Sequence, residues 1–194
     1  MLVFDEAHLL EDLQKLERRS CAAFSAACAE RLFPAYVAFS RAAGRGDVQS
    51  IAQMLECVWS DLVDEEIDLP RVQADLARCL ELIPGEDEEP WIAEQPYADD
   101  AASAVAYTLR ALQGGDPQDS AWAARRAYEA LDHYVTHKLG LDDEDQVVRH
   151  PTLQAELLRQ RRDLEELRLA GHDTTETLVR LRDRARAEAP GFFG

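Results

Sequence analysis

The sequence predicts an all-α protein, a single-domain bundle of about seven to nine helices around a Pro-kinked central helix. Apolar residues recur at helical spacing along most of the chain, and no stretch alternates apolar and polar residues between hairpin turns as strands do. Breaks containing Pro or Gly separate the helical stretches. At 194 residues the chain can bury one core without disulfides. We therefore expect one helical domain over residues 1–190 and a disordered tail at 191–194.

The central helix is expected in the stretch AAFSAACAERLFPAYVAF, residues 22–39. An earlier helix, capped by Asp5, should run to about Arg18, and Ser20 can cap the central one. Small and aromatic residues dominate residues 22–39, and the amphipathic helices expected in the rest of the chain could pack around them. Pro34 lacks an N–H and clashes with the preceding turn, so it either kinks the helix or starts a new one.

The remaining helices are bounded by capping residues and by Pro or Gly breaks. Residues 85–96 show no helical period and are expected to form a loop, the one plausible hinge. A short helical segment should open at 142–145, and Asp173 with Glu176 forms a capping box for a last helix. The other expected helices lie at about 47–63, 70–83, 99–112, 117–139 and 151–170.

The net charge of −17 is unevenly distributed. Residues 1–148 hold 12 Lys+Arg and 30 Asp+Glu, which sum to −18, and residues 149–194 hold 9 and 8, which sum to +1. The strongly acidic part of the chain, residues 1–148, repels phosphate backbones, which disfavours direct nucleic-acid binding. The charge is suited to a basic protein partner, although solubility alone also accounts for it.

The four cysteines, Cys21, Cys28, Cys57 and Cys79, form no CxxC pair and lie among apolar neighbours, as reduced core thiols do. The acidic N-terminus lacks the basic region of a signal peptide, and no apolar run reaches the roughly 18 residues of a membrane span. We therefore expect a cytoplasmic protein without a membrane segment.

The charged pair Glu30–Arg31 interrupts an otherwise apolar helix. With Tyr36, and with Asp99 at the start of an Ala-rich helix, it could line a small polar pocket. Alternatively, Arg31 is a buried strut that binds the carbonyls freed around Pro34 and is neutralised by Glu30. Both interpretations stay open at this stage.

A ladder of Glu129, His133 and His137, spaced by four residues, could bind zinc or iron. The Glu-x-x-His motif of di-iron bundles is not completed, and a solvated face with i,i+4 pairs explains the same pattern. We therefore predict no metal and no other cofactor. No nucleophile, phosphate-loop or dinucleotide motif is present. Arginines at 180, 182, 184 and 186 give the last helix a basic face, which we expect to dock on the acidic body of this chain.

Several blocks of sequence resemble the YjaG-like family of bacterial proteins, a domain of unknown function. The most specific block is CAERLFPAYVAF (28–39), where the family pattern matches Cys28, Glu30–Arg31, Pro34, Tyr36 and Phe39. The looser blocks are WSDL (59–62), IPGEDE (83–88), YADDAASAV (97–105) and HPTLQAELLRQ (150–160). The resemblance implies a compact all-helical cytoplasmic protein and brings no reaction or catalytic residue with it.

Together these observations predict an acidic, helical, non-enzymatic module that binds a basic protein partner. One alternative is an enzyme or small-ligand binder that uses the pocket near Glu30, Arg31, Tyr36 and Asp99. Another is an immunity-type or nucleic-acid-mimicking inhibitor, which requires a contiguous patch of carboxylates on one face.

Overall fold

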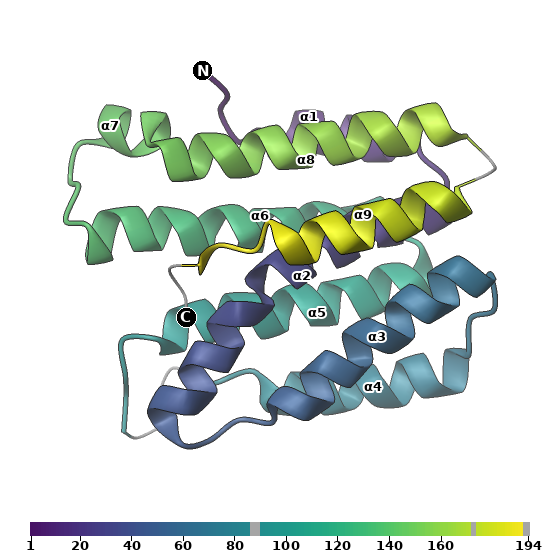
Figure 1. The fold of residues 1–194 in the computed structure, drawn as a ribbon, viewed down its shortest axis with the longest axis horizontal. Helices are drawn as coiled ribbons and strands as arrows, with labels where there is room; N and C mark the ends of the chain where they lie inside the picture. Colours follow the sequence, from purple (N-terminus) through teal and green to yellow (C-terminus); the bar gives the residue numbers. More distant parts are fainter. Residues whose placement is uncertain (86–89, 172–173, 192–194) are drawn as a thin grey trace.

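The computed structural model describes residues 1–85, 90–171 and 174–191. Within these ranges the chain forms nine α-helices, one π-helical segment and no strand, which confirms the all-α prediction (Figure 1). The acidic run at 86–89, Asp173 of the expected capping box and tail residues 192–194 lie outside the described residues. The elements are α1 (Glu6–Leu13), α2 (Arg18–Ala43), α3 (Val48–Asp64), α4 (Leu69–Leu82), α5 (Gln95–Gly114), α6 (Pro117–His133), the π-helical η1 (Tyr134–Lys138), α7 (Glu144–Arg149), α8 (Pro151–Ala170) and α9 (Thr175–Ala187).

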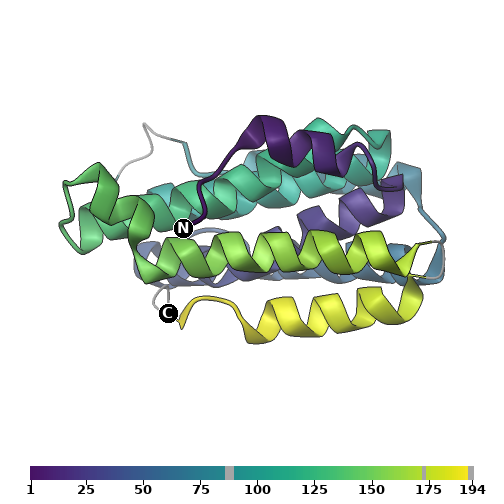
Figure 2. The same cartoon turned by 90° about the horizontal axis from the view of Figure 1, so that it is seen from above.

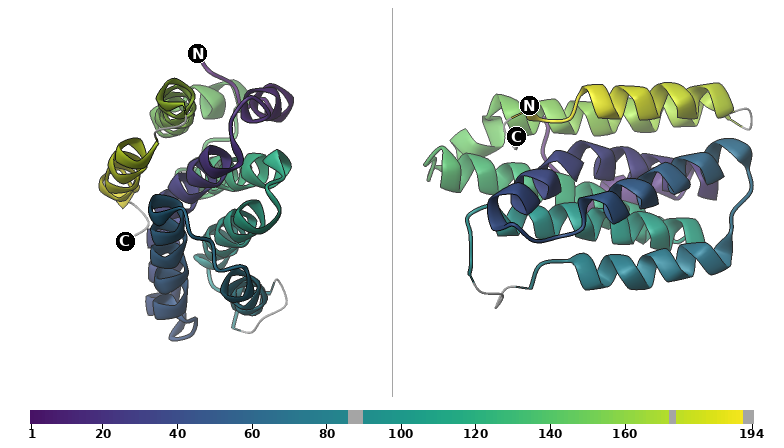
Figure 3. Two further views of the ribbon diagram at one scale, coloured as in Figure 1. Left: turned by 90° about the vertical axis from the view of Figure 1, so that its right-hand side faces the viewer. Right: turned by 60° about the horizontal axis from the view of Figure 1, so that its bottom comes forward.

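Helix α2 is the centre of the bundle. It packs against α5 and α6, and also against α3, α8 and α9 (Figure 3). Its residues from Ser20 to Leu32 are all buried, and most of them are small, so the neighbouring backbones can approach closely. The helix continues through Pro34, so the alternative of a new helix at this residue is wrong.

Four boundaries differ from those predicted. Helix α2 begins at Arg18 with Glu17 as its N-cap, so Ser20 lies inside the helix and does not cap it. Helix α1 ends at Leu13, because the chain turns tightly where Leu16 N–H donates to the Leu13 carbonyl at 3.0 Å. Helix α5 begins at Gln95, with Pro96 in its first turn, where a missing N–H costs nothing.

The last difference is at the end of α6. The expected helix to Leu139 instead changes at Tyr134 into the π-helical segment η1, in which Leu139 N–H donates to the carbonyl of Tyr134. The Thr136 hydroxyl donates to the carbonyls of Asp132 and His133, a local competition that accompanies the altered backbone.

Seen from above, helix α8 lies between α1 and α9 (Figure 2). Both α1 and α8 pack on α6. The N-terminal residues run beside α8 before the chain enters α1 (Figure 2). No helix in the described ranges combines the length and the apolar character needed to cross a bilayer.

Candidate functional site

Arg31 is the centre of a buried ion network between α2 and α8. Its guanidinium donates through Nε and Nη2 to the carboxylate of Glu156 at 3.0–3.2 Å and through Nη1 to Asp163 at 2.8 Å. Arg31, Glu156 and Asp163 are each at most 1% exposed. Burial alone would lower the pKa of Arg31, but the two carboxylates and Cys28 outweigh it and the pKa is raised. The arginine therefore stays charged, and its charge is fully matched.

The network differs from the strut that was one of the two interpretations of the sequence. Arg31 donates to carboxylates of α8 rather than to carbonyls around Pro34, and Glu30 is not its neutralising partner. The reason is that a distant helix supplies two buried acids, which local spacing does not reveal. Arg31 Nη2 also lies 3.4 Å from the Cys28 sulfur, and burial raises the pKa of this thiol, so it is no ready nucleophile.

Glu30 turns away from Arg31, toward α3 and α9. Its Oε1 accepts from Trp59 Nε1 at 2.9 Å and from Arg186 Nη2 at 2.9 Å. A cavity of about 330 Å³ lies beside Glu30, and Arg31, Tyr36 and Asp99 do not line it.

Tyr36 and Asp99 have separate surroundings. The Tyr36 hydroxyl donates to the Leu82 carbonyl at 3.1 Å and is fully buried, and burial raises its pKa. Asp99 is half-buried and accepts from Ser103 Oγ at 3.2 Å. The four residues of the expected polar pocket are thus divided among different contacts.

The ladder of Glu129, His133 and His137 is divided as well. The two imidazole rings lie together, with centroids 4.2 Å apart, at the start of η1. Glu129 is held by Arg125 at 2.7 Å and by Arg126 at 3.5 Å. In the described part of the chain, no group of three or more His, Cys, Asp or Glu side chains is placed to hold a metal ion.

The basic face of α9 docks on this chain, as predicted, through Arg184 and Arg186. Arg184 donates to Asp163 at 2.8 Å and to Glu166 at 2.7–2.8 Å, and Arg186 bridges Glu30 and Glu56. The other two arginines, Arg180 and Arg182, pair with acids of their own helix.

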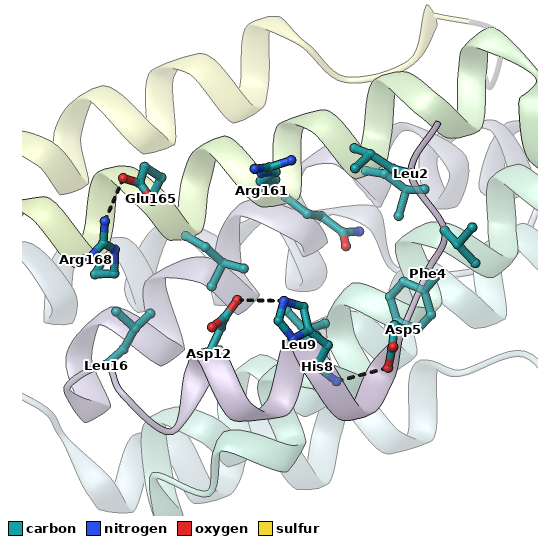
Figure 4. Close-up of a pocket in the computed structure, with 14 residues that line it drawn as sticks. Leu2, Phe4, Asp5, His8, Leu9, Asp12, Leu16, Arg161, Glu165 and Arg168 are labelled. Atoms are coloured by element: carbon teal, nitrogen blue, oxygen red, sulfur yellow. Dashed lines mark hydrogen bonds and ion pairs between the residues drawn. The ribbon is translucent and has the colours of Figure 1, made fainter.

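A groove of about 450 Å³ runs between the N-terminal segment with α1 on one side and α8 on the other (Figure 4). On α8 its lining extends from Leu157 to Arg168, a length of about 16 Å at 1.5 Å per residue. This volume falls in the range of ligand sites, and the shape suits an elongated guest. Its apolar lining consists of Leu2, Val3, Phe4, Leu9, Leu16, Leu157 and Leu164.

Specific contacts hold the N-terminal wall of the groove in place. Gln154 on α8 exchanges two hydrogen bonds with the backbone of Leu2, at 2.8 and 2.9 Å. Phe4 stacks on Tyr128 of α6 with ring centroids 5.1 Å apart, and Asp5 caps α1. Gln160, at the base, donates to the Ala124 carbonyl and to Glu156. The groove is therefore largely pre-formed.

The charges of the groove are paired, with one exception. Asp12 accepts from Lys15 at 2.7 Å, which lowers its pKa, and lies 3.7 Å from His8. Glu165 pairs with Arg168 at 2.8 Å. Among the described residues, Arg161 has no hydrogen bond or ion pair, and it stands on α8 across the groove from His8 and Asp12 (Figure 4).

Sequence reasoning did not identify this groove. The signal was present in the apolar residues Leu2, Val3 and Phe4 ahead of the first capping residue, which a hydrophilic N-terminal tail would lack. The position of Arg161 opposite them depends on how α1 and α8 pack on α6, and a single sequence does not contain that information.

The comparisons with known proteins identify a family. The family described as "Protein of unknown function (DUF416)" matches residues 8–190. This chain belongs to it. A crystal structure of a DUF416 family protein from Shewanella baltica OS155 is similar to this chain with a TM-score of 0.83 and 24% sequence identity, over 95% of this chain and 96% of that one. At this identity the likeness shows the fold.

No curated protein matches the chain. The expected resemblance to a domain of unknown function is confirmed, although the comparisons do not carry the YjaG-like name. The DUF416 description assigns no activity, so the function has to be argued from the groove and the charges.

Proposed function

We propose that this DUF416 protein is a non-enzymatic interaction module that holds a short amphipathic segment of another protein in the groove between α1 and α8. The observation that carries the proposal is the pairing of an apolar lining with one uncompensated cation, Arg161. The buried charges of Arg31, Glu156 and Asp163, by contrast, are matched within the fold. This division favours binding over catalysis.

The groove also defines the chemistry of the partner. Apolar side chains of the segment would cover Leu157, Leu164 and Phe4, and a carboxylate of the segment would meet Arg161. This differs from the basic partner that the net charge predicts, since the charges facing a partner, rather than their sum over the chain, decide local pairing.

Site-specific photo-crosslinking tests the proposal in the organism that makes the protein. A photoreactive phenylalanine replaces Val3, which is 61% exposed at the groove, or Leu80, which is 55% exposed on α4 and outside it. We expect a partner cross-linked from position 3 and absent from position 80. The cross-linked peptide, identified by mass spectrometry, should contain an acidic residue between apolar ones.

Charge reversal supplies the matched control. Arg161→Glu should abolish the cross-link and the binding of a synthetic peptide with the mapped sequence. Arg149→Glu makes the same change at an exposed position of α7 outside the groove and should leave both unchanged. Cross-links that form equally from positions 3 and 80, or that survive Arg161→Glu, contradict the proposal.

A basic protein partner is a second candidate, favoured by a hollow of about 630 Å³ at the turn between α3 and α4. Its lining includes the carboxylates of Asp61, Asp64, Glu66 and Asp68, and its one cation, Arg71, already pairs with Asp61 and with Asp75 at 3.0 Å. An immunity-type or nucleic-acid-mimicking inhibitor would use the same patch.

A Lys-rich peptide distinguishes this second candidate. The doubly substituted chain with Asp64→Lys and Glu66→Lys should lose salt-sensitive binding of the peptide. The same two charge changes at Asp142 and Asp145, which are exposed outside the hollow, should preserve it. Equal loss in both variants would attribute binding to net charge alone and remove the hollow as a site.

The four free cysteines support the proposal that the module works in a reducing compartment such as the cytoplasm.

A further inference from the structure

A second cavity, which shares no residue with the groove, lies where α2, α3 and the end of α9 meet. It encloses about 330 Å³, near the lower limit for small-ligand sites. Most of its wall is apolar and comes from Phe33, Pro34, Ala52, Leu55 and Ala189. The polar part of the wall belongs to Glu30, Glu56 and Arg186. A ligand that fits must therefore be small, with an apolar body and a polar end.

The polar part of the cavity wall contains two hydrogen-bond acceptors without a donor in the described part of the chain. Glu30 is only 6% exposed, and all three hydrogen bonds to its side chain, from Trp59 and Arg186, end on Oε1. Its Oε2 has no donor among the described residues. The backbone carbonyl of Glu30 also lacks the usual helical donor, because position 34 is proline.

The side chains that line the cavity carry two negative charges, one of them on the exposed Glu56, and one positive charge. Glu30 and Glu56 contribute two carboxylates, and Arg186 is the one guanidinium that binds both. Arg31, the neighbour of Glu30 in sequence, donates its N–H groups to Glu156, Asp163 and Cys28 instead. A carboxylate oxygen and a backbone carbonyl without donors, beside an apolar wall, suit a small cationic hydrogen-bond donor.

We propose that this cavity binds a primary ammonium group carried on a short alkyl chain. The ammonium donates to Oε2 of Glu30 and to the carbonyl of the same residue, and its methylene groups lie against Phe33 and Leu55. The chemistry is shared by free alkylamines and by the side chain of a lysine on another protein.

The test is a titration of the whole chain with n-butylammonium, followed by the NMR signal of the Trp59 indole N–H. This group donates to Glu30 and reports directly on the site, and its signal is assigned with Trp59→Phe. We expect a saturable shift of the Trp59 signal with n-butylammonium and none with n-butanol, which has the same chain without the charge. A shift that rises without saturation, or equally with butanol, overturns the proposal.

Two variants of α3 keep the test independent of folding defects. Glu30→Gln removes the acceptor but also breaks the pair with Arg186, so Ala52→Leu is used to fill the cavity without removing a polar contact. We expect Ala52→Leu to weaken n-butylammonium binding about tenfold or more. Gln53→Leu, next to it on the exposed face and outside the cavity, should bind as the unsubstituted chain does. Equal affinity of the Ala52→Leu and Gln53→Leu variants contradicts the assignment.

The source of the ammonium is distinguished with Nα-acetyl-lysine amide as the probe. Binding of this compound, lost on acetylation of its ε-amino group, identifies a lysine side chain as the ligand. Binding of n-butylammonium without binding of the lysine derivative identifies a free alkylamine.

Discussion

The two faces of α8 differ in the burial and the pairing of their charged side chains. The face toward α2 and α9 carries Glu156 and Asp163, both at most 1% exposed, and each lies within 4 Å of more than one arginine. The face toward α1 carries Arg161, an exposed cation with no partner among the described residues, beside leucines that line a groove.

The difference separates structural charges from charges available for binding. A buried ion is tolerated only where its partners compensate the loss of water, so the inner face has to be complete within the fold. The outer face has no such requirement, and an unpaired arginine beside apolar side chains is available to another molecule. Exposure and pairing, rather than residue type, distinguish the two faces of this helix and favour the outer face for the proposed binding.

Removing the central cation should have the largest effect. Arg31→Met leaves Glu156 and Asp163 buried without their main partner, and we expect a loss of about 3–5 kcal/mol in the free energy of unfolding. Urea denaturation followed by circular dichroism measures it. Replacing all three residues together, with Arg31→Met, Glu156→Gln and Asp163→Asn, should restore part of the loss. A single variant as stable as the unsubstituted chain would show that the network is dispensable.

Asp100 is a buried acid with fewer ion-pair partners than Glu156 and Asp163. It is 7% exposed and has Arg126 as its ion-pair partner at 3.1 Å. Burial raises the pKa of Asp100 from 3.8 to about 7, against the hydrogen bond from Arg126. The folded state then binds the proton more tightly than the unfolded one, so stability falls as pH rises from about 4 to 7 and levels off above.

Asp100→Asn should remove this pH dependence. Relative to the variant, the unsubstituted chain should lose at most about 1.4 kcal/mol per pH unit between pH 5 and 7. Urea midpoints at the two pH values measure the difference. Asp99→Asn makes the same change at the half-buried neighbour and serves as the control. Parallel pH profiles for the unsubstituted chain and Asp100→Asn would count against an uncompensated acid at this position.

At the edge of the Arg31 network we expect a smaller loss of stability than for Arg31→Met. Arg184→Ala removes the bonds from α9 to Asp163 and Glu166 but leaves Asp163 paired with Arg31. We expect a loss of about 1.5–3 kcal/mol, the range for hydrogen bonds to charged groups. Arg182→Ala, whose arginine pairs with its exposed neighbour Asp183, is the control and should change little. Equal effects of the two substitutions would mean that α9 is not held through Asp163.

The fold was largely accessible from the sequence, because helical periodicity, caps and Pro or Gly breaks are local signals. Pro70, Pro117 and Pro151 each stand in the first turn of a helix, as expected. The π-helical segment after His133 was not predicted, since neither helical periodicity nor a capping residue marks it in the sequence.

The sites were much less accessible. Glu30 and Arg31 stood out as charges in an apolar helix, but their partners come from α3, α8 and α9, more than 25 residues away in sequence. A single sequence contains no signal for such pairings. The groove was missed for the same reason, because its two walls are more than 140 residues apart.

The most direct test of the two-faced helix is the same substitution on each side of it. Arg31→Met and Arg161→Met remove one guanidinium each, and urea unfolding at one pH and salt concentration compares them. We predict a loss of about 3–5 kcal/mol for Arg31→Met and a change within about 0.5 kcal/mol for Arg161→Met. Equal losses, or a larger loss for Arg161→Met, would contradict the division of α8 into a structural face and a binding face.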